Sequence, residues 1–196
     1  MIKRVNIKKR FEQTDYFIEN HEYSQNELIH KNISLLNWNI QKKNRDPVWE
    51  TEFKHLIEKY KPEVILLQEC QFQKGLENIF HFEHYGFIFA PNFSDIFKDR
   101  HSGVLTASTA NHQSVTVIRS HAFEPLIKVP KIFLSTTYVI ENESKELLVL
   151  NIHAINFAGF WKFISQAQQL EYSIRSHDGP VILSGDFNTW NRKRSR

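Results

Sequence analysis

Residues 181–190 read VILSGDFNTW, and this stretch decides the fold. Its first residues, Val181 to Leu183, form a short apolar run that predicts a buried strand. Asp186 and Asn188 follow the apolar run, so a carboxylate and an amide lie where the strand ends. The carboxyl ends of central strands are where α/β architectures gather their sites, and the stretch therefore predicts a site at this position.

Other apolar runs also lead into polar residues. Asn39 lies within ISLLNWNI, Glu69 follows VILLQ, and His153 follows LLVLNI. Burying a carboxylate at a strand end is costly unless a cation or strong donors hold it. Hard oxygen ligands such as Glu69, with Asn39 and Asp186 nearby, suit Mg²⁺ or Mn²⁺. The pattern therefore predicts a metal site that could polarise a phosphoryl oxygen.

Helical patterns flank a β-rich middle. Apolar residues recur at helical spacing from Trp49 to Tyr60, and again from Phe160 to Ile174. Between these helices lie predicted strands at residues 103–108, 114–120, 132–140 and 146–152. The strands are too close together for the crossover helices of a single parallel sheet. The order predicts an α/β (α+β) fold of two packed sheets with helices outside.

Composition excludes several classes of protein. The 196 residues, 41% hydrophobic and 24% charged, are typical of one globular domain. A net charge of +3 is too mild to imply nucleic-acid binding by itself. Cys70 is the one cysteine, which excludes a disulfide framework and a Cys-rich zinc site, and we interpret it as a buried small residue.

The ends of the chain carry less information. Residues 1–31 are polar and predict an N-terminal extension, and residues 32–196 form the predicted domain. The basic start has no apolar run behind it, so we expect no secretory signal. No stretch reaches the length of a membrane span, and no obligate protein partner is evident. The default expectation is a cytoplasmic protein.

Five segments together resemble a known superfamily. In chain order they are NWNIQ, LLQE, SGVLTAS, NIHAIN and GDFNTW. They are similar to the endonuclease/exonuclease/phosphatase superfamily, which has the DNase I-like fold, and in particular to uncharacterised bacterial members. The resemblance implies a four-layer α/β/β/α sandwich of two mixed β-sheets. It also implies Mg²⁺-dependent hydrolysis of phosphate esters by in-line attack of an activated water.

The resemblance also implies site roles. Asn39 and Glu69 match the metal-site pair, and His153 matches the phosphate-contacting histidine. Asn156 matches a residue that helps to bind the phosphate. Each has a structural alternative, because a strand-end amide, a solvated carboxylate or a satisfied core histidine needs no chemistry.

Asp186 and Asn188 match the pair that positions or activates the water. Their alternative is an Asx-type turn without a chemical role. The substrate would be a phosphate ester, with nucleic acid as one candidate. In this superfamily the surface loops determine which substrate binds, and a resemblance in fold does not predict the substrate from them.

One departure from the superfamily keeps a second function open. Its members carry a further Asp-His pair on a strand after GDFN, and no Asp-His dipeptide occurs in this sequence. The last strands are expected to be missing as well, which would expose a sheet edge. The alternative to an active phosphodiesterase, nuclease or phosphatase is a homologue that only binds a metal or a phosphate ligand. A weaker alternative is nucleic-acid binding without cleavage, which rests on the basic ends.

Overall fold

A computed structural model describes residues 11–12, 18–29, 32–73, 83–95, 97–123, 130–154, 168 and 170–188. The named elements in chain order are β1 (Phe11–Glu12), β2 (Ile18–Asn20), β3 (Leu35–Asn39), α1 (Pro47–Tyr60), β4 (Val64–Gln73), β5 (Gly86–Asp95), β6 (Arg100–Ser108), β7 (Ser114–Phe123), β8 (Pro130–Tyr138), β9 (Leu147–His153) and β10 (Val181–Asp186). Residues 170–175 form a further helical turn.

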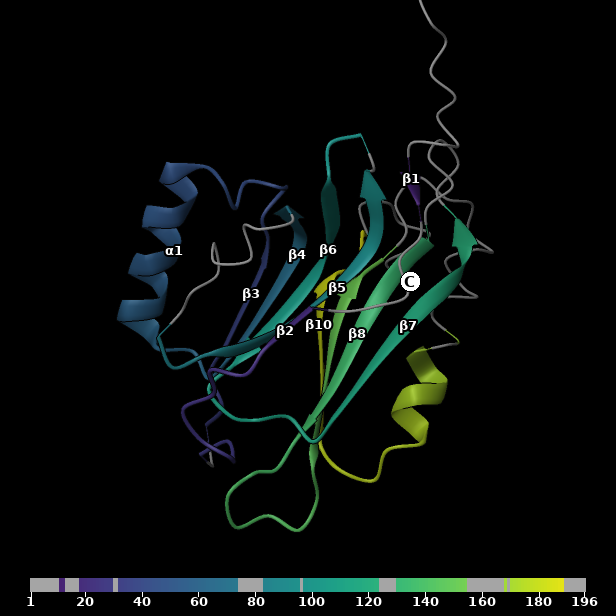
Figure 1. Cartoon of the computed structure of the whole chain (residues 1–196). Helices are drawn as coiled ribbons and strands as arrows, with labels where there is room; N and C mark the ends of the chain where they lie inside the picture. Colours follow the sequence, from purple (N-terminus) through teal and green to yellow (C-terminus); the bar gives the residue numbers. More distant parts are fainter. Residues whose placement is uncertain are drawn as a thin grey trace, which may run out of the picture.

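The strands form two mixed sheets. The first has the order β1-β5-β6-β4-β3, with β2 also paired to β5, and the second has the order β10-β9-β8-β7. β3 runs parallel to β4 and β10 runs parallel to β9, whereas the other pairs are antiparallel. Figure 1 shows the two sheets packed together, with α1 beside β3 and β4 and the residue 170–175 helix below β7. This arrangement confirms the predicted sandwich of two mixed sheets.

The helix α1 covers the outer face of the first sheet. Its start is fixed by Asp46, whose side chain accepts a hydrogen bond from the Val48 backbone N–H, and by Pro47 in the first turn. Lys61 ends it in a left-handed conformation. Trp49 and Phe53 are buried against the sheet, as the helical spacing predicted.

Strand alternation divides each sheet between two hydrophobic layers. In the first sheet, Val64 and Leu66 face the second sheet, while Ile65 and Leu67 face α1. In the second sheet, Leu147 and Val149 face the first sheet. Leu148, Leu150 and Ile152 face the other way and pack on Leu170 and Ile174 of the short helix. The layers are therefore helix, sheet, sheet and helix.

The N-terminal segment differs from the expected extension. β2 pairs with β5 in the first sheet, and Leu28 is fully buried between the sheets. The backbone N–H of Leu28 donates to the Val139 carbonyl at 2.9 Å. Residues 18–29 are thus part of the sandwich. The sequence does not indicate this, because few of their side chains are apolar. The boundary of the domain at residue 32 stays a prediction.

Some sequence predictions lie outside the described residues. They include most of the helical pattern expected from Phe160 to Ile174, of which the structure describes residue 168 and residues 170–174. Within the described part of the chain, no helix is both long and apolar enough to cross a membrane.

Candidate active site

Three strands deliver polar side chains to one end of the sandwich. Asn39 ends β3, His153 ends β9 and Asp186 ends β10. Strand alternation turns all three toward the space between the sheets, because Leu35, Val149 and Ile182 on the same strand faces belong to the layer between the sheets. Asp186 lies directly beside His153 in the parallel ladder. The apolar runs predicted the strand-end placement of His153 and Asp186, whereas Asn39 was expected within its strand and is the last residue of β3.

Glu69 reaches the same region by a different route. The sequence predicted that the strand ends before Glu69, but β4 continues to Gln73. Its pairing with β6 breaks between Leu67 and Cys70, and Glu69 lies in that break with a left-handed φ of 56°. Leu67 and Cys70 both pack on the α1 side.

This bulge determines which face of the sheet the Glu69 carboxylate lies on. In a regular strand Glu69 would follow Ile65 and Leu67 onto the face that packs against α1. The extra residue removes Glu69 from that alternation, so its carboxylate lies near Asn39 and His153. The Glu69 carbonyl also accepts a hydrogen bond from the Lys42 backbone N–H at 2.9 Å. The loop after β3 thereby holds the bulge in place.

The Asn39 amide joins two carboxylates. Its Nδ2 donates to Asp186 Oδ2 at 2.7 Å and approaches Glu69 Oε1 at 3.4 Å. Its Oδ1 accepts from the Gln41 backbone N–H at 3.0 Å, which sets the orientation of the amide. The three side chains therefore form one connected group drawn from both sheets.

His153 completes the group. The residue is only 6% exposed, and its Nε2 lies 3.7 Å from Glu69 Oε1. At this distance a protonated imidazole would be strongly attracted to the carboxylate, because burial reduces solvent screening. The ring thus lies beside the carboxylate group, where it can present charge or a donor to an anion.

Asp186 and Asn188 form the Asx turn that the sequence left as their structural alternative. The Asn188 backbone N–H donates to Asp186 Oδ1 at 2.9 Å, and Asn188 has a left-handed φ of 49°. The Asn188 side chain reaches back to β9, where its Nδ2 donates to the Ala154 carbonyl at 2.9 Å. The turn does not remove a chemical role for Asp186, because it orients the carboxylate toward Asn39.

The backbone conformation and a close contact both require glycine at position 185, the first residue of the GDFN segment. Gly185 has a φ of +144°, and a Cβ added there would lie 2.1 Å from the Ile152 carbonyl oxygen. Only glycine allows β10 to approach β9 this closely. The close approach brings Asp186 beside His153.

The donor set fits a hard divalent cation. Glu69 and Asp186 are carboxylates that share the amide of Asn39, and oxygen atoms of these groups are the ligands that Mg²⁺ and Mn²⁺ prefer. Magnesium sites commonly use one or two carboxylates and keep several waters. Among the described residues, no group of three or more His, Cys, Asp or Glu side chains is placed to hold a metal. The fit to a divalent cation thus rests on the two carboxylates of Glu69 and Asp186.

Sequence reasoning missed the buried amides beneath this group. Gln68 and Asn151 are both fully buried and hydrogen-bond to one another. The sequence signal for them is an amide inside an apolar run at a position facing the other sheet, in VILLQ and LLVLN. Asn156, which was expected to help bind phosphate, lies outside the described residues.

Cys70 takes no part in the group. It is fully buried and packs with the α1-side layer, in agreement with its interpretation as a buried small residue. Burial raises the pKa of its thiol well above the ordinary value. Cys70 is therefore a core residue and not a nucleophile.

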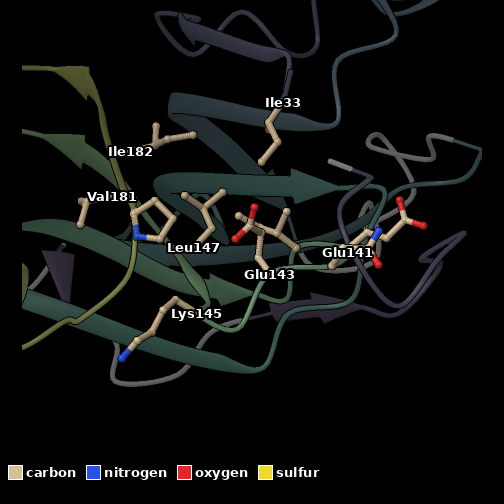
Figure 2. Close-up of a pocket in the computed structure, with 10 residues that line it drawn as sticks. Ile33, Glu141, Glu143, Lys145, Leu147, Val181 and Ile182 are labelled. Carbon is tan, nitrogen blue, oxygen red and sulfur yellow. The ribbon is translucent and has the colours of Figure 1, made fainter. Parts of the chain in front are cut away.

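A cavity of about 570 Å³ lies elsewhere in the molecule. Its lining includes Ile33, Leu147, Val181 and Ile182, with Glu143 close to Leu147 and Lys145 below them in Figure 2. Leu147 and Val181 begin β9 and β10, whereas His153 and Asp186 end them. The cavity and the polar group thus lie at opposite ends of the same two strands.

Comparison with known proteins relates this chain to a family. The model of the Endonuclease/Exonuclease/phosphatase family matches residues 36–196. A UPF0294 protein of Photorhabdus laumondii is 33% identical over 164 residues, which are 83% of this chain and 60% of the relative. A UPF0294 protein of Erwinia tasmaniensis is 34% identical over 172 residues, which are 85% of this chain and 60% of the relative. The chain therefore spans about 60% of the length of these curated relatives.

Solved structures share the fold at low sequence identity. An endonuclease/exonuclease/phosphatase from Beutenbergia cavernae has a TM-score of 0.59 at 17% identity and covers 81% of this chain and 48% of that one. The human Nocturnin catalytic domain has a TM-score of 0.55 at 18% identity and covers 89% of this chain and 67% of that one. TDP2 from Caenorhabditis elegans has a TM-score of 0.58 at 14% identity and covers 84% of this chain and 49% of that one.

Proposed function

The chain belongs to the Endonuclease/Exonuclease/phosphatase family, and from this premise we propose that it carries a Mg²⁺- or Mn²⁺-dependent hydrolytic site for phosphate esters. Members of this family are generally hydrolytic phosphoesterases. The proposal extends that activity to the group formed by Asn39, Glu69, His153 and Asp186.

One observation carries the proposal. The two carboxylates Glu69 and Asp186 come from different sheets, yet both lie against the same Asn39 amide. Placing like charges close together is unfavourable unless a donor or a cation offsets the repulsion. Such locally unfavourable groupings of charge are typical of functional sites, and two neighbouring carboxylates are suited to binding a divalent cation.

Glu69 and Asn39 are the residues that would hold the cation. When bound, the cation would polarise a phosphoryl oxygen and offset the negative charge that develops on it during attack. Gln41 and the bulge at Glu69 keep the two side chains in place, because each is tied to the loop after β3 by backbone hydrogen bonds. Glu69 is thus already in place, whereas the Asn39 amide would have to turn over to bring Oδ1 to the cation, because Nδ2 faces both carboxylates and Oδ1 faces Gln41.

Asp186 is the residue that would orient the attacking water. Each carboxylate oxygen accepts one hydrogen bond, from Asn188 N–H and from Asn39 Nδ2, and each retains further acceptor capacity. A water held there would lose its proton to the carboxylate as its oxygen attacks phosphorus and the ester bond breaks. His153 would donate to a phosphoryl oxygen from the neighbouring strand end. Asn156 is proposed to assist in phosphate binding.

The second candidate function is binding without hydrolysis. Carboxylates, an amide and an imidazole that lie together can bind a divalent cation or a phosphate ligand without cleaving an ester. In this case the chain would bind such a ligand at the same group and hydrolyse no ester. Within either proposal nucleic acid is one candidate ligand, and a cytoplasmic setting without an obligate protein partner is the working expectation.

A hydrolysis assay separates the two candidates. The purified chain is incubated with bis(p-nitrophenyl) phosphate and Mg²⁺, and p-nitrophenol release is followed. EDTA and Glu69→Gln should each abolish the activity, while Glu52→Gln on the exposed side of α1 should leave it unchanged. A folded chain that releases no p-nitrophenol, but binds Mn²⁺ in a manner lost in Glu69→Gln, would favour the binding function.

A further inference from the structure

Two buried amides connect the sheets directly beneath the candidate site. Gln68 of β4 and Asn151 of β9 each have no exposed surface, and Gln68 Nε2 donates to Asn151 Oδ1 at 2.8 Å. Around them the layer between the sheets is apolar, with Leu66 and Val149 on the same strand faces. The bond is therefore a polar link between the sheets inside a hydrophobic layer.

Each amide is held by further bonds. Gln68 Nε2 also donates to Asn37 Oδ1 at 2.9 Å. Asn151 Nδ2 donates to the Leu105 carbonyl at 2.8 Å and approaches Thr106 Oγ1 at 3.3 Å. Asn151 of β9 is therefore bonded directly to β4 and β6 of the opposite sheet, and Gln68 connects it to β3. Such a network determines the relative position of the sheets more narrowly than apolar contacts do.

The network is adjacent to the site on both strands. Gln68 immediately precedes Glu69, and Asn151 lies two residues before His153 on the same face of β9. Glu69 and His153 lie on opposite sheets, with 3.7 Å between Glu69 Oε1 and His153 Nε2. Any slip between the sheets at the Gln68–Asn151 bond would therefore change that distance.

Stability alone does not explain the network. Replacing both partners of a buried hydrogen bond by apolar groups of the same shape is often nearly neutral for folding. In addition, Gln68 Oε1 is buried and has no hydrogen-bond partner among the described residues, which is an unfavourable feature that an apolar side chain would remove. A role in the site accounts for keeping amides at these positions.

We infer that Gln68 and Asn151 are positioning residues, whose hydrogen bond across the sheets sets the spacing of Glu69 and His153 for phosphate-ester hydrolysis. The inference rests on the proposed function of that site. Neither amide touches the reacting atoms, so each acts through its neighbour on the strand.

The test uses the double variant Gln68→Met/Asn151→Leu of the full chain, which replaces both amides by apolar side chains of similar size. The matched control is Thr136→Val, which changes another fully buried polar residue, on β8, at a position paired with Val149. For each protein we would measure urea unfolding, the crystal structure, and kcat and KM for Mg²⁺-dependent hydrolysis of bis(p-nitrophenyl) phosphate.

The expected result is a double variant that still folds but has a lower urea midpoint, because Asn37 Oδ1 and the Leu105 carbonyl lose a donor. Its kcat should fall by about 10- to 100-fold with little change in KM, because the substrate is still bound but the groups are misplaced. Its crystal structure should show a changed Glu69–His153 separation, and Thr136→Val should match the wild type in each property.

Two results would overturn the inference. One is a double variant that hydrolyses the ester at the wild-type rate. The other is a double variant whose Glu69–His153 separation is the same as in the wild type. If the wild-type chain hydrolyses nothing, the proposed function fails, and the crystallographic separation still decides whether the two amides position the pair.

Discussion

Asn39 Nδ2 and Asp186 Oδ2 are joined by a hydrogen bond of 2.7 Å, although the residues are 147 positions apart in the sequence. The bond crosses from one sheet to the other, because among the described strands β3 is last in the first sheet and β10 is last in the second. Two strands that meet in this way bring the carboxyl ends of two parallel strand pairs together. The first prediction follows from this contact.

Asn39→Asp should make the site depend on a cation. The change replaces the donor between Glu69 and Asp186 with a third carboxylate, so like charges repel and the hydrogen bond is lost. Without a cation we expect the free energy of unfolding to fall by about 1–3 kcal/mol. Mg²⁺ should recover much of the loss, because it binds only the folded site.

Differential scanning fluorimetry in EDTA and in Mg²⁺ measures this effect. Asn142→Asp is a suitable control, since Asn142 is exposed and lies in the turn before β9. A melting temperature for Asn39→Asp that equals the wild-type value in EDTA would show that Asn39 does not separate the carboxylates.

Gly185→Ala should loosen the strand that carries Asp186. A Cβ at this position would lie 2.1 Å from the Ile152 carbonyl oxygen, and the φ of +144° is one that alanine rarely adopts. We expect a loss of about 1–3 kcal/mol in the free energy of unfolding, measured with urea. Ser184→Ala changes the preceding residue of β10 without either conflict and should be close to neutral. Equal unfolding curves for the two variants would contradict the account of Gly185.

Cys70 should resist alkylation in the folded protein. Burial raises the pKa of its thiol, so at pH 8 a smaller fraction is thiolate than in an exposed cysteine, and the reagent also has no access. Mass spectrometry after iodoacetamide treatment should find the thiol unmodified in buffer and fully modified in urea. Rapid modification in buffer would mean that the α1-side layer opens readily.

His112 should make the fold less stable as the pH falls. Burial lowers the pKa of its imidazole below the ordinary value of 6.5, although Glu19 opposes the shift and His21 adds to it. Its Nδ1 lies 2.9 Å from the Tyr23 hydroxyl and its Nε2 lies 3.0 Å from Glu19 Oε1. A neutral ring can accept from the Tyr23 hydroxyl at Nδ1, and burial favours this neutral form because a charged ring would lose its solvation.

The sign of this effect follows from proton linkage. Just below pH 6.5 the unfolded chain binds a proton at residue 112 that the folded chain does not, so the stability contributed by His112 is complete above pH 6.5 and falls below it. His112→Gln should remove part of the pH dependence measured by urea unfolding between pH 5 and 7. The control is His84→Gln, because His84 is exposed. Identical pH profiles for His112→Gln and wild type would exclude His112 as the source.

His112 also shows what a local pattern does not reveal. No motif of the sequence includes it, yet its side chain is only 13% exposed. Its partners Glu19 and Tyr23 belong to the polar N-terminal segment, whose pairing with β5 has no local signal. A polar cluster of this kind can be identified only from the folded structure, because its residues come from segments that are far apart in the sequence.

Most of the fold is predictable because its signals are local. An apolar run, a helical period and a strand-end carboxylate can each be recognised within ten residues, and VILSGDFN and LLVLNIH are examples. The resemblance supplies the order of the segments and hence the sandwich. Asn39, His153 and Asp186 can therefore be identified from the sequence, while their catalytic roles stay predictions.

The placement of Glu69 and the pairing of Gln68 with Asn151 depend on the folded molecule. Alternation along β4 would carry Glu69 to the α1 side, and only the bulge against β6 turns it toward His153. Gln68 and Asn151 are 83 residues apart and meet because two sheets pack face to face. The local pattern of residues thus determined the strands and the polar groups at their ends. Packing between the sheets decided which of those groups meet, because contacts between distant segments depend on register and bulges that no local pattern encodes.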